Sequence, residues 1–247
     1  MCIIAIKKTG AEMFPETTIR TMFTNNPDGA GIMYYDYLLQ KVIYHKGFMK
    51  VEQLLDFIKD RDWKNIPVVL HFRIGTSGHK TKLCTHPFPV YDKNKVFGTT
   101  DLAVCHNGVL NNYFPGANSA INDSLNFTQK VLSKLDPSFI RDTDKLMLIE
   151  ELIGTSKLAF IDSTGCITLL GNFIEDGDYV YSNSSYKPRE YPKYSYKPRI
   201  GYYSSNLFGD PDDYDSEMDE DSKHRLNDYL SLLDDREYIG ENGDFAY

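Results

Sequence analysis

The sequence predicts an α+β domain with layered sheets, and three observations lead to that class. Short apolar runs typical of strands occur both before and after segments with helical spacing. Two of these runs are close enough to pair as a hairpin. The first 185 residues carry a net charge of only −1, and a chain of about 200 residues can bury a full core. Strands on both sides of helices favour sheets and helices packed in layers.

In the first half of this domain, each predicted element has its own signal. A short apolar strand starts at Cys2. Pro15 in a first helical turn favours a helix, and apolar residues of a later segment recur on one helical face. Two apolar runs are joined across the short segment 37–40, which predicts a hairpin. The predicted strands are 2–8, 29–36, 41–47 and 68–73, and the predicted helices are 15–23 and 51–61.

The second half continues the pattern. An apolar run that ends in polar residues predicts a strand over 101–107. Two helices are predicted over 124–135 and 143–153. Three strands are predicted over 157–162, 166–171 and 178–183. Periodicity alone indicates nothing finer than this α+β class.

Charge divides the chain into three parts. Residues 1–185 form the predicted domain. Residues 186–209 carry a net charge of +4 and are rich in Tyr, Pro and Lys, which predicts a surface linker. The alternative is a partner or nucleic-acid contact, because tyrosines between lysines can stack on bases. Residues 210–247 carry a net charge of −11 and predict a low-complexity acidic tail, with one possible short helix around Leu226–Leu233.

Composition excludes several classes of protein. The overall net charge of −8 argues against a generic DNA-coating protein. No apolar run approaches the roughly 18 residues that a membrane-spanning helix needs. The N-terminal apolar run is short and precedes the lysines, the wrong order for a signal peptide. Four cysteines are too sparse for a disulfide scaffold. We therefore expect a soluble, cytoplasmic protein.

Cys2 is the first residue with distinctive chemistry. Removal of Met1 would leave a thiol and a free α-amine on one residue. Their ordinary pKa values are about 8.5 and 7.7–8.0, so moving a proton from thiol to amine costs only ~1 kcal/mol. Such a nucleophile carries its own base and needs no histidine. The alternative is that Cys2 is merely the first residue of a strand.

Three further segments carry polar side chains suited to a common site. Arg73 ends a strand before a Gly/Ser/Thr loop, and its planar fork fits a carboxylate. Asn107 and Gly108 end another strand, where a side-chain amide beside a glycine N–H can bind an oxyanion. Asp123 precedes a predicted helix, which it could cap, or it could pair with an ammonium group.

These residues belong to six short motifs: MC at the start, NNPDGAG (25–31), HFRIGTSG (71–78), CTHPF (84–88), CHNG (105–108) and NDS (122–124). In this order and spacing the sequence resembles a class II glutamine amidotransferase domain of the N-terminal-nucleophile hydrolase superfamily, over about residues 2–185. The resemblance implies a four-layer αββα sandwich of two antiparallel sheets between helices. It also implies hydrolysis of the glutamine side-chain amide to glutamate and ammonia, without a cofactor.

The resemblance assigns a role to each matching residue. Cys2 would be the nucleophile, acting through a thioester, and its α-amine the base. Asn107 and the Gly108 N–H would form the oxyanion hole. Arg73 would hold the substrate α-carboxylate and Asp123 the α-ammonium. One cation and one anion at a fixed separation suit the zwitterionic end of glutamine.

Two more positions and two departures complete the comparison with that family. Thr76 and His86 match positions that line the same pocket. An arginine that the family has ahead of the NNPDGAG motif is missing, since Asn25 or Asn26 stands there. The position after Arg73 is aromatic in the amino-sugar synthase members and is Ile74 here. Both departures concern pocket closure and any ammonia channel, and leave hydrolysis intact.

A zinc site is the competing interpretation of the cysteines and histidines. No CxxC or HxxxH spacing is present, and the adjacent Cys105 and His106 point to opposite faces of a strand. We therefore expect no metal. The residues weighed for this site are Cys84, His86, Cys105, His106, His71 and His79.

The fate of the ammonia leaves three hypotheses. The chain could supply ammonia to a separate synthase, since about 60 low-complexity residues cannot form a second domain. It could be a free-standing hydrolase of another γ-glutamyl compound, which shares the end read by Arg73 and Asp123. It could also be a catalytically silent module that binds a partner. The joint presence of Cys2, Arg73, Asn107 and Asp123 argues against the silent module.

Overall fold

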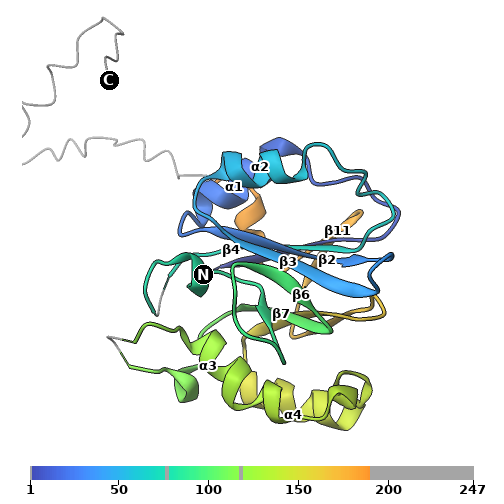
Figure 1. Ribbon diagram of the computed structural model, residues 1–247. Helices are drawn as coiled ribbons and strands as arrows, with labels where there is room; N and C mark the ends of the chain where they lie inside the picture. Colours follow the sequence, from blue (N-terminus) through green and yellow to red (C-terminus); the bar gives the residue numbers. More distant parts are fainter. Residues whose placement is uncertain (1, 76–77, 117–118, 190–247) are drawn as a thin grey trace, which may run out of the picture. The chain divides into compact units, whose positions relative to one another are not determined.

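The computed structural model describes residues 2–75, 78–116 and 119–189, which lie within one compact unit, Met1–Tyr191. Within these ranges the chain forms two antiparallel sheets and four α-helices. Figure 1 shows them as four layers, with helices on the outer face of each sheet. The predicted α+β class and the αββα sandwich are confirmed.

The first sheet contains the N-terminal strand in its interior. Its strand order is β10-β11-β1-β4-β2-β3-β6. Because β1 lies between β11 and β4, it is held from both sides. The strands are β1 (Ile3–Lys7), β2 (Ala30–Asp36), β3 (Lys41–Phe48), β4 (Val68–Phe72), β6 (Phe97–Thr100), β10 (Ile174–Asp176) and β11 (Tyr179–Tyr181).

The second sheet is smaller and has the order β5-β7-β8-β9. Its longest pairing joins β7 to β8 over six residue pairs, from Leu102 opposite Asp162 to Asn107 opposite Lys157. The strands are β5 (Phe88–Pro89), β7 (Leu102–Asn107), β8 (Lys157–Asp162) and β9 (Ile167–Leu170).

Two helices cover each sheet. Helices α1 (Glu16–Asn25) and α2 (Val51–Ile58) bury apolar side chains against the first sheet, and α3 (Asp123–Lys130) and α4 (Thr143–Ile153) do so against the second. Asn122 and Asp142 cap α3 and α4 by accepting backbone N–H groups. Helix α3 ends at Lys130, five residues earlier than predicted, and a 3₁₀ turn follows over Leu132–Lys134.

The layer between the two sheets changes from apolar to polar along its length. Alternate residues of a strand share a face. The inward faces therefore begin with buried apolar residues such as Ile6, Val69 and Ala103. At the other end of the strands, the same faces carry polar side chains and a thiol: Cys2, His71, Arg73, Lys46 and Asn107. All of them except Cys2 are buried. This polar end of the inner layer gathers the buried polar side chains from which a functional site can be built.

Three short strands, β5, β6 and β10, were not predicted from the sequence. β5 has two residues, one of them a proline, and β10 has three exposed residues, so neither shows an apolar pattern. Among the described residues no helix is long and apolar enough to cross a bilayer. The boundary at residue 185 stays a prediction. The acidic tail and all but the first residues of the 186–209 linker lie outside the described residues.

Candidate active site

Five of the seven predicted site residues line one small cavity at the polar end of the inner layer. They come from five separate parts of the chain, and the cavity is closed by their neighbours Ile74, His106, Asn122 and Ser124. Its volume is about 20 Å³, room for about one water molecule. An amino acid could enter only if the walls move apart. The five residues are Cys2, Arg73, His86, Gly108 and Asp123.

The other two predicted residues are placed differently. The side chain of Asn107 is buried next to the cavity but points to Ser182. Thr76 lies outside the described residues. Larger hollows run along α4 and between α1 and α2, but their walls contain no cysteine.

The Cys2 thiol lies against the backbone of Ile74. Cys2 Sγ accepts the Ile74 N–H at 3.4 Å and lies 3.5 Å from the Ile74 carbonyl oxygen. Burial raises the pKa of the Cys2 thiol above its ordinary value, although the Ile74 N–H and the charge of Arg73 oppose that shift. The thiol is therefore protonated at neutral pH, and any reaction in which it attacks needs a base.

Arg73 is 2% exposed, and hydrogen bonds of its backbone fix its position. Its N–H donates to the Gly29 carbonyl at 2.8 Å, and its carbonyl accepts the Asp28 N–H at 2.9 Å. The NNPDGAG motif therefore extends the pairing of β2 with β4 past Phe72. The Asp28 carboxylate also accepts the Gly75 N–H at 2.8 Å, which fixes the chain just after the arginine.

Asp28 remains ionised in this arrangement. Burial would raise the pKa of its carboxyl group, but the Gly75 N–H and the ion pair with Lys80, at 2.7 Å, outweigh burial and lower the pKa. The structure shows a carboxylate that secures the segment after Arg73.

Asp123 is the first residue of α3 but does not cap it. Asn122 does so, because its Oδ1 accepts the Leu125 N–H at 2.9 Å. The buried Asp123 carboxylate instead accepts the Leu110 N–H at 2.8 Å. Of the two roles considered for Asp123, helix capping is therefore wrong. Asp123 and Arg73 bring one negative and one positive charge to the same cavity.

Gly108 follows β7 with a backbone that only glycine adopts readily. Its φ is +150°, and a Cβ atom there would lie 2.1 Å from Ser156 Oγ. The absence of a side chain lets the Gly108 backbone form part of the cavity wall. The adjacent Asn107 donates from Nδ2 to Ser182 Oγ at 2.8 Å.

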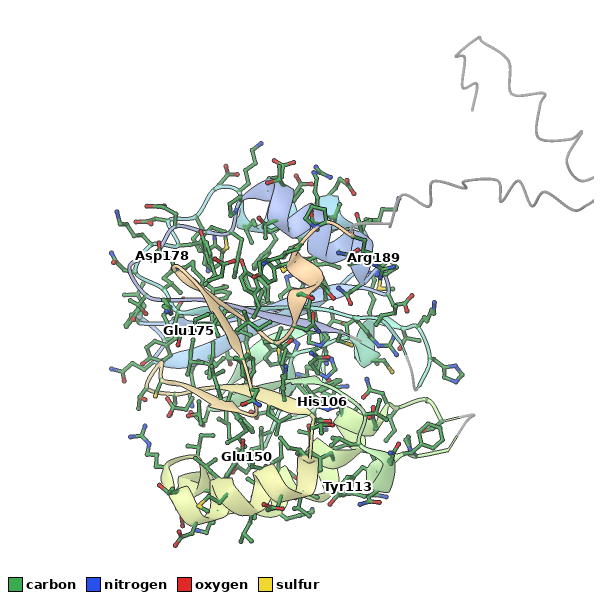
Figure 2. All side chains as sticks on the ribbon, turned by 180° about the vertical axis from the view of Figure 1, so that it is seen from behind. His106, Tyr113, Glu150, Glu175, Asp178 and Arg189 are labelled. Carbon is green, nitrogen blue, oxygen red and sulfur yellow. The ribbon has the colours of Figure 1, made fainter. Side chains whose placement is uncertain are left out.

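Two buried histidines, His86 and His106, line the cavity, and a third buried histidine, His71, contacts His86. The His71 and His86 rings lie 4.0 Å apart, and the His106 ring is 6.3 Å from His86. Figure 2 shows His106 where the strands meet α3, and its Nδ1 lies 2.7 Å from Ser124 Oγ. Burial lowers the pKa to about 3 for His71, to about 4 for His106 and well below the ordinary value for His86. All three are neutral at physiological pH.

Lys46 is a further buried group that the sequence analysis missed. Its ammonium group lies 4.1 Å from the centre of the Phe88 ring and donates to Asn94 Oδ1. Burial lowers the pKa of Lys46 to about 7. The signal was present in the sequence, because Lys46 is two residues from Tyr44 and shares its inward face.

The structure also bears on the zinc alternative. In the described ranges, no group of three or more His, Cys, Asp or Glu side chains is arranged to hold a metal ion. The His71 and His86 rings are close but tilted by 31°, and proximity alone is not enough, since metal ligands must direct their nitrogen atoms to one point.

Comparison with solved structures finds chains that resemble this one. Searches against models of protein families and against curated proteins find no match. The chain is similar to a glutamine phosphoribosylpyrophosphate amidotransferase from B. subtilis, solved with ADP and GMP, at 18% identity and a TM-score of 0.44. The match covers 74% of this chain and 42% of that one. A likeness of this size carries no argument about activity, which must come from the site.

The buried histidines predict a loss of stability in mild acid. Below pH 6.5 the unfolded chain binds protons that the folded chain cannot, because all three folded-state pKa values are lowered. Their stabilising effect is therefore complete above about pH 6.5 and is lost as pH falls toward the folded-state values. Denaturant unfolding should show the free energy of unfolding falling between pH 7 and 5, by about 2 kcal/mol per histidine.

A pair of variants tests the origin of this loss. His86→Leu removes one titrating ring that has no hydrogen-bond partner among the described residues, so the pH dependence should shrink by about a third. His79→Gln changes an exposed histidine and should leave it unaltered. A free energy of unfolding that is the same at pH 7 and 5 in the unsubstituted protein would contradict the assignment.

Proposed function

We propose that this protein hydrolyses the side-chain amide of glutamine to glutamate and ammonia, with the Cys2 thiol as nucleophile. The observation that carries the proposal is the meeting of Cys2, Arg73 and Asp123 in one cavity. A thiol, a cation and an anion from three distant parts of the chain form the combination that an amino-acid amidase needs. Their burial costs stability, and an inert core would be more stable with apolar residues there.

Recognition of the substrate follows from the two charges. Arg73 pairs with the α-carboxylate through its planar fork, and Asp123 accepts hydrogen bonds from the α-ammonium. Both contacts concern the amino-acid end of the substrate, which leaves the γ-carboxamide to reach Cys2. Other γ-glutamyl compounds share the same end and are the alternative substrates.

The reaction proceeds in two halves. The Cys2 sulfur attacks the γ-carbonyl carbon, and the carbonyl oxygen becomes an oxyanion that the Gly108 N–H and the Asn107 amide stabilise. Collapse of this intermediate breaks the C–N bond, releases ammonia and leaves a γ-glutamyl thioester. Water then attacks the thioester, and glutamate leaves as the thiol is regenerated. Neither half requires a cofactor.

The base for these proton transfers is the α-amine of Cys2, exposed once the bond between Met1 and Cys2 has been cut. The neighbouring histidines are poor candidates, because a base whose pKa lies far below 7 has little affinity for a proton at neutral pH. Within the described ranges no histidine is hydrogen-bonded to Cys2 Sγ, whose partner is the backbone of Ile74. The ammonia would pass to a separate synthase.

The first test is glutamate release by the purified protein from glutamine, beside a γ-glutamyl peptide. Cys2→Ala should abolish turnover, and Cys2→Ser should nearly do so because a hydroxyl is far harder to ionise than a thiol. Cys166→Ala, at an exposed free cysteine, is the matched control and should keep full activity. Intact mass should show Cys2 as the first residue. Full activity in protein that retains Met1 would refute the α-amine mechanism.

The second test concerns recognition of the amino-acid end. Arg73→Lys replaces a bidentate fork by a point charge, so KM for glutamine should rise more than tenfold, or ~1.4 kcal/mol. Asp123→Asn should have a similar effect while still accepting the Leu110 N–H. Arg141→Lys, at an exposed arginine that forms an ion pair with Asp162, is the matched control and should not change KM. If both site variants keep the original KM, the pocket assignment is wrong.

A further inference from the structure

The residue after β11 forms hydrogen bonds both to β1, the strand that follows the proposed nucleophile, and to the Asn107 amide, which is proposed to stabilise the oxyanion. Ser182 directly follows Tyr181 and is fully buried. Its Oγ accepts the Ile4 N–H at 2.8 Å and is also bonded to the Asn107 amide at 2.8 Å. Ile4 is two residues after Cys2, so a single hydroxyl connects β1 to the end of β7.

Two polar atoms in this contact are left unsatisfied. With Asn107 Nδ2 donating, Ser182 Oγ receives two N–H groups, and its own hydrogen has no acceptor among the described residues. Asn107 Oδ1 is buried and likewise has no partner there. Leaving such groups unpaired costs roughly 1–3 kcal/mol each. One of these groups belongs to Ser182 and the other to Asn107, the two residues that the hydrogen bond joins.

Half a turn of the amide about its last bond gives the Ser182 hydrogen an acceptor and Asn107 Oδ1 a donor. The nitrogen and oxygen of an asparagine amide have nearly the same shape, so the turn requires no other movement. The Ser182 hydroxyl then keeps the Ile4 N–H as its donor and gives its hydrogen to Asn107 Oδ1. Asn107 Nδ2 takes the place of the buried atom without a partner, so neither of its N–H groups is used by the described residues.

We propose that Ser182 is a positioning residue that keeps Asn107 in this second orientation, with its N–H groups available to the reacting carbonyl oxygen. The hydroxyl hydrogen favours this direction: the Ile4 N–H can only donate, so among the described hydrogen-bond partners of Ser182 Oγ only the Asn107 amide can accept that hydrogen. This proposal rests on the proposed function, because it deepens the role of Asn107 in that reaction.

The neighbouring contacts make the position of Ser182 rigid. The Ser182 N–H donates to the Ile4 carbonyl at 2.9 Å, and the Lys157 ammonium donates to the Ser182 carbonyl. Asn183 Nδ2 donates to the Cys2 carbonyl at 2.6 Å, while its Oδ1 accepts the Ser185 N–H. The two residues after β11 therefore hold the Cys2 backbone and the Asn107 side chain in one register.

Kinetics of a double-mutant cycle test the proposal. Ser182→Ala should lower kcat for glutamine by about tenfold or more with KM within about twofold, because only binding of the developing oxyanion is weakened. In an Asn107→Ala background, Ser182→Ala should change kcat by less than about twofold, since nothing is left to orient. An unchanged kcat for Ser182→Ala, or an equal loss in both backgrounds, would overturn the proposal.

Neutron diffraction from crystals exchanged into D₂O tests the orientation without any assay. We expect one deuteron between Ser182 Oγ and Asn107, carried by the hydroxyl, and two deuterons on the amide atom facing away from Ser182. Two deuterons on the amide atom that contacts Ser182 would overturn the proposal. A protein with no amidase activity but with the expected deuterons would refute the proposed function and leave the orientation standing.

Discussion

The antiparallel register between β1 and β4 is the constraint on which the site depends. Ile3 pairs with Phe72 at the end of the ladder, so Cys2 lies opposite Arg73, one residue beyond each strand. This register places the thiol on the Ile74 backbone and within the field of the Arg73 charge. A slip of one residue would turn every side chain of β1 to the opposite face. Cys2 would then face the helices α1 and α2 instead of the cavity.

The rest of the sandwich maintains that register against a considerable electrostatic cost. The apolar part of the inner layer is continuous on both sheets and fixes their separation. The polar end then buries Arg73, Asp123, Lys46 and three histidines. Burial shifts the pKa values of Lys46 and the histidines toward their neutral forms. The histidines are therefore neutral at physiological pH, and the charged side chains that line the cavity are Arg73 and Asp123, the ones proposed to bind substrate.

Much of the fold could be predicted from the sequence, because its main strands and helices have clear periods. The hairpin of β2 and β3 and the four helices follow from apolar spacing. Short edge strands could not be predicted, since β5 and β10 have too few residues to show a pattern. The early end of α3 at Lys130 could not be predicted from the sequence either. Leu132 continues the apolar spacing, although the backbone there forms a 3₁₀ turn.

The candidate site was predicted as a set of residues but not as a geometry. Motif order brought Cys2, Arg73, His86, Gly108 and Asp123 together, and the cavity contains all five. The sequence could not show that Asn122, and not Asp123, caps α3, since either side chain can accept an N–H. Contacts such as Ser182 with Asn107 join residues 75 positions apart. Ser182 follows a strand of the first sheet and Asn107 ends a strand of the second, so only the packing of the two sheets brings them together.

The most direct test of the central claim is to look for the covalent intermediate. The purified protein should be mixed with glutamine, quenched in acid within a turnover and digested, and the N-terminal peptide analysed by mass spectrometry. The account predicts a peptide that begins at Cys2 and carries a γ-glutamyl group on sulfur. Glutamate release without this adduct at any quench time, or an adduct on another residue, would contradict it.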